Sequence, residues 1–348
     1  MPRDDWQDRR HIELEPKPFG KVPLSRTVPR RQVPRDLAQR RAKGNDKYVP
    51  PHDRFRPGLA GRLDGTLSLV TPMHVGSGIY DLRQGEVIRG LVFNGSDPVI
   101  PGTSLKGAVR STAEAISRSC LRITRREIQR SLSSRQAEPC KNVRAASSGR
   151  SDLCTCCSLF GALGYRGRVA FGEARTTGAR TSIHRVQSPY PPREGARAYR
   201  NDRREFDGRK FYYHGAPATV KSGEPYLAID PQSTFRFSMH FENVSEEELC
   251  LLLVAMGISD DLIIKMGGGK QAMLGSVEVY PETLEIIDPA ASFSDFTGGV
   301  RSLGGDQLKA FIDGIGNGHS GLIDEEALDA LMKIWDRNSP HPAPKGMY

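Results

Sequence analysis

The sequence predicts an α+β fold in which strands and helices follow one another in a ferredoxin-like order. Three observations predict it. A strand pattern precedes a helix pattern over residues 62–120, a second strand feeds directly into a helix over residues 234–256, and a closing strand pattern follows over residues 276–280. Long stretches without such periodicity separate these segments, so we expect one core that is interrupted by insertions.

The first half of this core begins at Arg62. From this residue apolar or small side chains alternate with polar ones, which is the period-two signature of a half-buried strand. The helix predicted from about Thr103 to Cys120 has apolar residues at every third or fourth position, so one face packs and the rest is solvated. The apolar or small positions are Leu63, Gly65, Leu67 and Leu69 in the strand, and Leu105, Val109, Ala113 and Ile116 in the helix.

The second half begins with a strand from Thr234 to Val244, where apolar residues again occupy every other position. Ser245 and Glu248 have the spacing of a capping box, in which each side chain bonds the backbone N–H of the other residue. This pattern predicts a helix that starts directly after the strand. The apolar positions of this helix are Leu249, Leu252, Leu253 and Met256.

The composition favours a protein with a buried core and a polyanionic partner. The chain has 348 residues, of which 37% are hydrophobic and 26% are charged. Its net charge is +9, and cations that neutralise phosphates supply affinity that does not depend on nucleotide sequence. We find no apolar run long enough for a bilayer and no signal-peptide pattern, so we expect a cytoplasmic protein. A disulfide framework is not expected in that reducing compartment.

The two ends of the chain differ from the core in composition. Residues 1–58 are rich in Arg, Lys, Pro and Asp, which predicts a disordered basic arm that orders on RNA or on a neighbouring subunit, or alternatively a solubilising tail. The core is expected over residues 59–288. Residues 289–348 are predicted to be a tail with one amphipathic helix from Glu325 to Trp335.

The helix start within residues 101–111, with the sequence PGTSLKGAVRS, predicts an anion site. The first turn of a helix presents unpaired backbone N–H groups and the positive end of the helix dipole. Lys106 and Arg110 lie one turn apart on this helix and would add two cations, while Thr103 and Ser104 stand in its first turn. The natural ligand is a phosphate. The alternative is an ordinary helix with two exposed cations.

Two further segments suit nucleic acid. The Gly-Gly-Gly-Lys loop at residues 267–270 lets the backbone approach a ligand closely and offers N–H groups to phosphate; a flexible turn is the alternative. It is not an ATP-binding Walker loop, because Gln271 stands where Ser or Thr is required. Between Pro189 and Pro231, aromatic residues are interleaved with arginines, as in sites for single-stranded nucleic acid. The alternative there is a local packed cluster under a long loop.

The cysteines predict a zinc site. Cys154 and Cys157 form a Cys-x-x-Cys knuckle that can place two thiolates on one Zn²⁺, and Cys140 with a fourth ligand would complete a tetrahedron. The fourth ligand is Cys156, Cys120 or a histidine. Such a site would be structural, since it pins a loop that has no core of its own. The alternative is a set of buried or redox-active thiols.

Four segments together resemble a known family. They are residues 159–161 (LFG), 167–174 (GRVAFGEA), 208–214 (GRKFYYH) and 266–277 (MGGGKQAMLGSV). In this order and at these separations, the chain resembles the RAMP superfamily of RNA-binding proteins over residues 62 to about 282. The resemblance is specifically to the backbone subunits of type III CRISPR effector complexes, and the run at residues 208–214 points to the type III-D and III-E branch.

The resemblance implies a ferredoxin-like core of the kind found in RNA-recognition modules, with a zinc-binding insertion at about residues 120–160. A second insertion, at about residues 175–230, would form a thumb that wedges into the guide–target duplex. The implied partners are CRISPR guide RNA, complementary target RNA and other RAMP subunits. The residues assigned to RNA contact, by motif or by resemblance, are His74, Thr103, Ser104, Lys106, Arg110, Arg168, Arg209, Lys210, Tyr212, Gly267, Gly268, Gly269 and Lys270.

The resemblance also implies an endoribonuclease. In the family a loop aspartate promotes attack of the target RNA's own 2′-hydroxyl on the adjacent phosphate, together with Mg²⁺ or another divalent ion. Asp81 matches that aspartate in chemistry and Glu86 is the reserve, although Gln84 and Glu86 occupy the positions nearest the matching segment. The alternatives are a non-catalytic capping subunit and a zinc-stabilised RNA-binding protein outside CRISPR defence.

Overall fold

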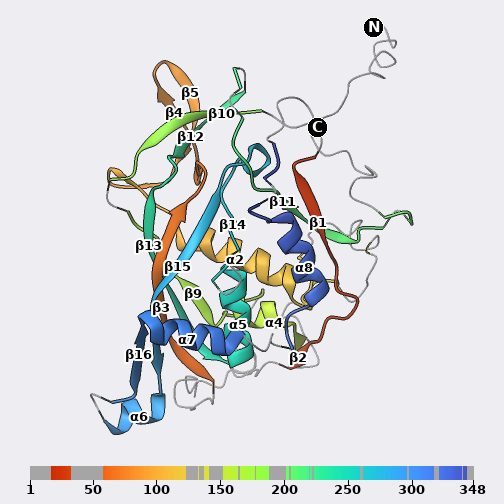
Figure 1. Cartoon of the computed structure of the whole chain (residues 1–348), viewed down its shortest axis with the longest axis vertical. Helices are drawn as coiled ribbons and strands as arrows, with labels where there is room; N and C mark the ends of the chain where they lie inside the picture. Colours follow the sequence, from red (N-terminus) through yellow and green to blue (C-terminus); the bar gives the residue numbers. More distant parts are fainter. Residues whose placement is uncertain are drawn as a thin grey trace, which may run out of the picture.

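The structure is a computed structural model. It describes residues 17–32, 58–122, 132, 137–140, 152–163, 165–176, 178–187, 201–203, 205–218, 220–221, 223–258, 262–295, 298–316, 321–338 and 340–342. Within these residues the chain is a mixed α+β protein, in which a large antiparallel sheet has helices to one side of it (Figure 1).

The central sheet has the strand order β14-β15-β3-β13-β9, and β16 pairs with the second half of β15. Leu63 and Leu67 of β3 and Phe235 of β13 are fully buried while their sequence neighbours are not, which confirms the predicted period-two strands. The strands are β3 (Leu59–Leu69), β9 (Val169–Phe171), β13 (Thr234–Val244), β14 (Ile264–Lys265), β15 (Ser276–Ile287) and β16 (Val300–Gly304).

Two helices connect these strands and pack against each other: α2 (Gly102–Ile116) and α5 (Glu246–Ala255). The core therefore runs β3–α2–β9–β13–α5–β15. The predicted capping box of α5 is confirmed, because the Glu248 N–H donates to Ser245 Oγ at 3.2 Å and the Ser245 N–H donates to the Glu248 carboxylate at 3.1 Å. Helix α2 ends before Cys120, since Ser117 is extended and bridges to Ile323.

A second sheet with the order β10-β12-β5-β4 lies at the top of the molecule in Figure 1. Its strands are β4 (Gly76–Arg83), β5 (Glu86–Leu91), β10 (Thr181–Val186) and β12 (Glu224–Ile229), and the short pair β6 (Phe93–Asn94) and β7 (Asp97–Pro98) follows β5. Strands β4 and β5 form a hairpin whose two turn residues, Gln84 and Gly85, both have positive φ. This is the turn type that matches the twist of a two-stranded ribbon.

Residues 17–32 pack on the core, so the expectation of a disordered arm over residues 1–58 is wrong for this segment. Strand β1 (Phe19–Pro23) pairs with β11 (Gly208–Tyr212), and β2 (Arg31–Gln32) pairs with β8 (Asp152–Leu153). Val22 is fully buried. The segment has too few apolar residues to show a period in sequence, and its strand forms because β11 supplies a partner. Residues 1–16 and 33–57 lie outside the described residues.

The C-terminal part is also folded against the core over the described residues 298–316 and 321–338. It contains α6 (Pro289–Ser294), β16, α7 (Gly305–Gly316) and α8 (Glu325–Ile334). Leu308 of α7 and Leu331 of α8 are buried. The amphipathic helix predicted at Glu325 is confirmed as α8. Strand β16 and helix α7 were not predicted, because both are short and bounded by glycines. In the described part of the chain, no helix has the length and apolarity to cross a membrane.

The structure describes parts of the two expected insertions. In the range 120–160 it shows β8 and α4 (Thr155–Phe160), and in the range 175–230 it shows β10, β11 and β12. The rest of the predicted thumb, including residues 188–200, lies outside the described residues.

Candidate nucleic-acid interface

A pocket of about 400 Å³ lies between helix α2, strand β11 and the segment that links β14 to β15. It brings together three segments that the sequence singled out separately: the start of α2, the run at residues 208–214 and the glycine loop. The lining contains three lysines and no carboxylate, which is the electrostatic signature of an anion site. Its polar lining residues are Ser104, Ser111, Thr112, Lys210, Tyr212, Lys265 and Lys270.

Lys265 is the lysine that sequence analysis missed. It lies in β14, is 6% exposed, and donates to Ser276 Oγ at 3.2 Å across the β14–β15 pair. Burial, together with the nearby charge of Lys270, lowers the pKa of Lys265 to about 7. The signal in the sequence was a single lysine inside an otherwise apolar run, Leu-Ile-Ile-Lys-Met, directly before the glycine loop.

A hydrogen-bonded chain holds Lys265 from behind. His214 Nε2 donates to the Ile263 carbonyl at 2.8 Å, because a carbonyl can only accept. Its Nδ1 therefore accepts from the Ser276 hydroxyl at 2.8 Å, which leaves the Ser276 oxygen to accept from Lys265. Burial, and then the charge of Lys265, lowers the pKa of His214 to about 3, so this ring is neutral.

The glycine loop is held against the backbone of His74. Gly267 has a φ of +82°, and a Cβ at this position would lie 2.5 Å from the His74 carbonyl oxygen. The Gly268 N–H donates to that same oxygen at 2.7 Å, so it is not available to a phosphate. Gly269 also has a left-handed backbone conformation, and it precedes a single 3₁₀ turn at Lys270–Ala272. Lys270 is half-buried, and burial lowers its pKa.

Strand β11 brings Lys210 and Tyr212 to the pocket, and the N-terminal strand β1 orients them. The register places Phe19 opposite Tyr212. The Lys210 Nζ lies 4.2 Å from the centroid of the Phe19 ring and 4.7 Å from that of Tyr212. Both distances fit cation–π contacts. Phe19 is a further residue that sequence analysis did not connect with the site.

Four predicted RNA ligands contact protein groups and do not line the pocket. Lys106 donates to the Val169 carbonyl at 2.6 Å, and Arg110 donates to Glu114 at 2.7 Å. Arg209 bonds the carbonyl oxygens of two residues that follow α2 and also pairs with Glu114. Arg168 forms a buried ion pair with Glu248 at 2.6 Å. Thr103 is exposed in the first turn of α2, outside the pocket lining.

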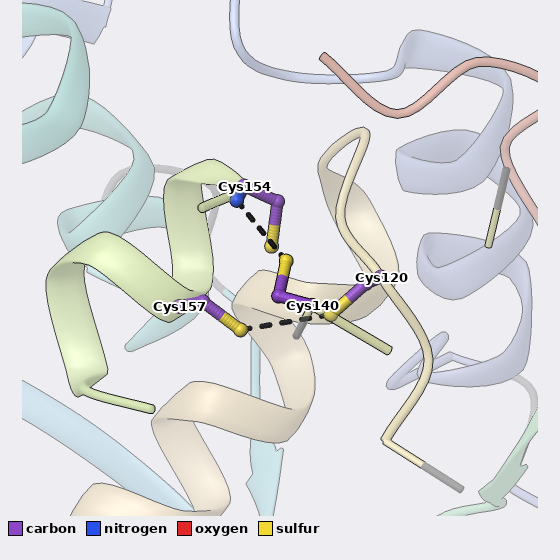
Figure 2. A group of neighbouring side chains, drawn as sticks. All are labelled: Cys120, Cys140, Cys154 and Cys157. Atoms are coloured by element: carbon purple, nitrogen blue, oxygen red, sulfur yellow. Dashed lines mark hydrogen bonds between the residues drawn. The ribbon is translucent and has the colours of Figure 1, made fainter. Parts of the chain in front are cut away.

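The cysteine cluster lies at the other end of α2. The sulfurs of Cys120, Cys140, Cys154 and Cys157 all lie within 4.8 Å of one another. Figure 2 shows these four side chains pointing toward one another, with Cys154 and Cys157 at the start of α4. Four sulfurs at such separations are the donor set of a tetrahedral zinc site. Hydrogen bonds within the cluster, chiefly those from Cys120, lower the pKa of Cys140 and of Cys154, while hydrogen bonds to the same neighbours raise the pKa of Cys120 and of Cys157.

Cys156, which was predicted among the metal ligands, lies outside this cluster of sulfurs, and Cys120 lies within it. Cys156 lies on the opposite side of the α4 turn, fully buried in the main core, with its Sγ 3.5 Å from Ser117 Oγ. Burial raises its pKa to about 12, which opposes the thiolate that a metal needs. Sequence spacing did not show this, because it says little about which of two neighbouring cysteines faces inward.

Comparison with known proteins identifies the family. The profile of the RAMP superfamily matches residues 66–278, which is more than half of the chain. The chain belongs to the RAMP superfamily. The matched residues include the cysteine cluster and all of the pocket lining except Trp335.

Among solved structures, this RAMP protein is similar to a chain in a cryo-EM structure of the Type III-B Cmr-beta bound to cognate target RNA. The identity is 17% and the TM-score is 0.35. The similarity covers 66% of this chain and 61% of that chain. A search of curated proteins finds no match.

The carboxylates predicted to act in cleavage lie on the β4–β5 hairpin of this RAMP protein, away from the pocket lining. Asp81 is solvated and accepts from Arg83 Nε at 2.8 Å and from the Leu82 N–H at 2.9 Å. These hydrogen bonds, chiefly that from Arg83, lower its pKa. Glu86 forms a two-bond ion pair with Arg185 of β10, at 2.8 and 2.7 Å.

His74 serves to join loops within the RAMP core. It is 4% exposed, and its Nδ1 donates to the Leu227 carbonyl at 2.7 Å. Its ring packs edge-to-face with that of Tyr226, with the two ring centroids 4.7 Å apart. Burial is the main cause that lowers its pKa. Since its backbone oxygen also holds Gly268, His74 positions the glycine loop beside the pocket without lining it.

Proposed function

We propose that this RAMP protein binds CRISPR guide RNA as a backbone subunit of a type III effector complex and positions complementary target RNA. The observation that supports it most strongly is the pocket lined by Lys210, Lys265 and Lys270 without a carboxylate. An RNA backbone carries a phosphate at every nucleotide, and lysines that meet those phosphates bind without regard to base sequence. This is what a guide of variable sequence requires.

Two finer assignments belong to the same proposal. The core order β3–α2–β9–β13–α5–β15 around the sheet order β15-β3-β13-β9 supports a ferredoxin-like arrangement of the RAMP core. The run at residues 208–214 supports the type III-D and III-E branch, and its Lys210 and Tyr212 lie in the pocket lining.

The test is to express the chain with its host's CRISPR array and companion subunits, purify it, and sequence the RNA that comes with it. We expect enrichment of repeat–spacer guides over cellular RNA. Random cellular RNA would instead support an RNA-binding protein outside CRISPR defence, and the absence of RNA would overturn the proposal.

We also propose that Cys120, Cys140, Cys154 and Cys157 hold a structural zinc ion. Three of the four are buried, and Cys140 is half-buried, so the cluster leaves no open position of the kind that a catalytic zinc needs. The cluster joins the end of α2, the residue Cys140 and the start of α4. A bound zinc would add Cys140 to the packing between α2 and α4, beside a small apolar cluster that includes Val28 and Leu153.

A second candidate function is cleavage of the target RNA. The ion pairs that Asp81 and Glu86 form decide which of these carboxylates is tested first. Both carboxylates are ion-paired, Glu86 through two bonds to Arg185 and Asp81 through one bond to Arg83, so a divalent ion would displace fewer arginine bonds at Asp81. The assembled complex with Mg²⁺ should cut a complementary RNA, and Asp81→Ala should stop the cutting while guide and target binding persist. Uncut target with the unaltered chain would favour the non-catalytic capping role.

A further inference from the structure

Lys265 is a buried cation without a counter-ion in the described part of the chain. It is 6% exposed, and its Nζ contacts the Ser276 hydroxyl at 3.2 Å. No carboxylate within ion-pair distance of this Nζ is found among the described residues. An ammonium removed from water is costly unless it is paired, so the pocket is built around a group that lacks its partner.

The groups around Lys265 do not supply that partner. Strand β15 contributes Ser276, and helix α2 contributes hydroxyls to the pocket but no charge. The remaining groups are cationic or neutral at neutral pH, since His214 is an uncharged ring. The titratable or charged groups that face the pocket or the chain behind Lys265 are Lys210 and Tyr212 of β11, His214 after β11, Lys270 of the glycine loop, and Arg337 after α8.

The hydrogen bonds behind Lys265 leave part of its Nζ directed elsewhere. An ammonium has three N–H donors, and Ser276 Oγ accepts one of them. Ser276 cannot turn its own proton toward the amine without losing its bond to His214 Nδ1, which is itself fixed by the Ile263 carbonyl. The other donors of Lys265 therefore remain for a ligand in the pocket, which Lys265 lines together with Lys270.

We propose that Lys265 is the proton-linked phosphate ligand of the pocket. In the empty pocket a share of the molecules hold Lys265 as the neutral amine, and when a backbone phosphate enters, the amine takes up one proton from the solvent and becomes an ammonium that pairs with the phosphate. RNA affinity then falls as the pH rises above neutrality. This inference rests on the proposed RNA-binding function.

The direction in which RNA affinity changes with pH follows from the thermodynamic linkage between proton binding and RNA binding. The pKa of Lys265 is lowered from 10.5 to about 7 in the empty pocket, and an anion beside the ammonium raises it again. Protons are therefore bound on RNA binding between about pH 7 and the higher pKa of the complex, and each pH unit in that window lowers the affinity by up to about tenfold. Below about pH 6 the amine is already charged, and the dependence disappears.

The test uses the full-length chain and a fluorescent single-stranded RNA of mixed sequence, with affinity measured by anisotropy at constant ionic strength from about pH 6 to about pH 8.5. We expect the unaltered chain to lose about tenfold in affinity over this range. Lys265→Arg, whose charge is permanent, should bind with a flat profile, and Lys265→Gln should bind weakly with a flat profile. Lys333→Gln, an exposed lysine of α8, is the control and should keep the full pH dependence.

Calorimetry of the unaltered chain gives a readout that needs no variant. In two buffers of different ionisation enthalpy at about pH 7.5, the apparent binding enthalpy should differ by the amount expected for uptake of a fraction of a proton. No proton uptake, or a pH profile of Lys265→Gln that matches the unaltered chain, would overturn the inference while RNA binding stands. Failure of the unaltered chain to bind RNA at any pH would overturn the proposed function itself.

Discussion

The Nη2 of Arg110 lies 3.7 Å from the Sγ of Cys157, while the Nε of the same side chain donates to Glu114 at 2.7 Å. Helix α2 therefore contacts the cysteine cluster through Arg110 in its middle turns, and on another face it lines the pocket from Ser104 to Thr112. Arg110, which the sequence motif placed among RNA ligands, lies inside the protein as a cation beside thiols. Four thiolates around one Zn²⁺ carry net negative charge, which a guanidinium offsets.

We predict that Cys120→Ser loses the bound zinc whereas Cys156→Ala keeps it. Cys120 supplies one of the four clustered sulfurs, and Cys156 faces the core. Zinc per chain measured by atomic emission should fall below about half for Cys120→Ser, with a clear drop in melting temperature. Equal zinc content in the two variants would show that Cys120 is not a ligand.

Arg110→Gln should weaken zinc retention without removing a ligand. The substitution takes away the cation that contacts Cys157. Outer partners of metal ligands change metal affinity by about 10- to 100-fold, so a competing chelator should strip the variant at a correspondingly lower concentration. Its RNA affinity should keep the salt dependence of the unaltered chain, because Arg110 does not line the pocket. A smaller slope of log RNA affinity against log salt concentration would show that Arg110 contacts RNA.

Arg168→Met should destabilise the fold strongly. The side chains of Arg168 and Glu248 are each 11% exposed, and the arginine also holds the Asn243 carbonyl at the turn between β13 and α5. Removing one partner leaves Glu248 as a buried carboxylate, which costs about 3–5 kcal/mol in urea unfolding. Arg175→Met removes the solvated Arg175–Glu173 pair and is the control, whose unfolding midpoint should stay unchanged.

Lys270→Gln should lower RNA affinity at every sequence and reduce the slope of log affinity against log salt by about 1, as expected for one lost phosphate contact. Lys270 lines the pocket, and burial holds its pKa below the ordinary lysine value. Lys309→Gln, an exposed residue of α7, is the matched control. An unchanged slope for Lys270→Gln would remove this lysine from the interface.

Acid should destabilise the protein in part through His214. Its pKa is about 3 in the fold against an ordinary 6.5, so its contribution to stability is complete above pH 6.5 and is lost as the pH falls toward the folded value. Between about pH 6 and about pH 5 this one group should lower the free energy of unfolding by about 1 kcal/mol. Lys265 is charged in both states there. In the His214→Gln variant, the free energy of unfolding should no longer fall by this amount between the two pH values. The control His240→Gln, at an exposed position, should keep the full decrease.

Local patterns were enough to predict the strands β3 and β13, the helix α2 and the capped start of α5. Each of these elements shows its buried face as a period in the sequence, because side chains alternate along a strand and return every third or fourth residue along a helix. The Cys-x-x-Cys knuckle and the glycine loop were likewise visible, since their chemistry depends on residue type and close spacing.

Only the tertiary structure decided which polar residues face a ligand. Lys106, Arg110, Arg168 and Arg209 look like surface cations in the sequence, yet each contacts a carbonyl or carboxylate supplied by a distant segment, which for Arg110 is the Gly161 carbonyl. Lys265 looks like an isolated charge in an apolar strand, and packing against Ser276 and the glycine loop makes it the deepest cation of the pocket lining. The choice of Cys120 over Cys156, and the pairing of β1 with β11, were decided in the same way. A sequence pattern records the face that a residue takes on its own element, whereas its partner depends on which elements the fold brings together.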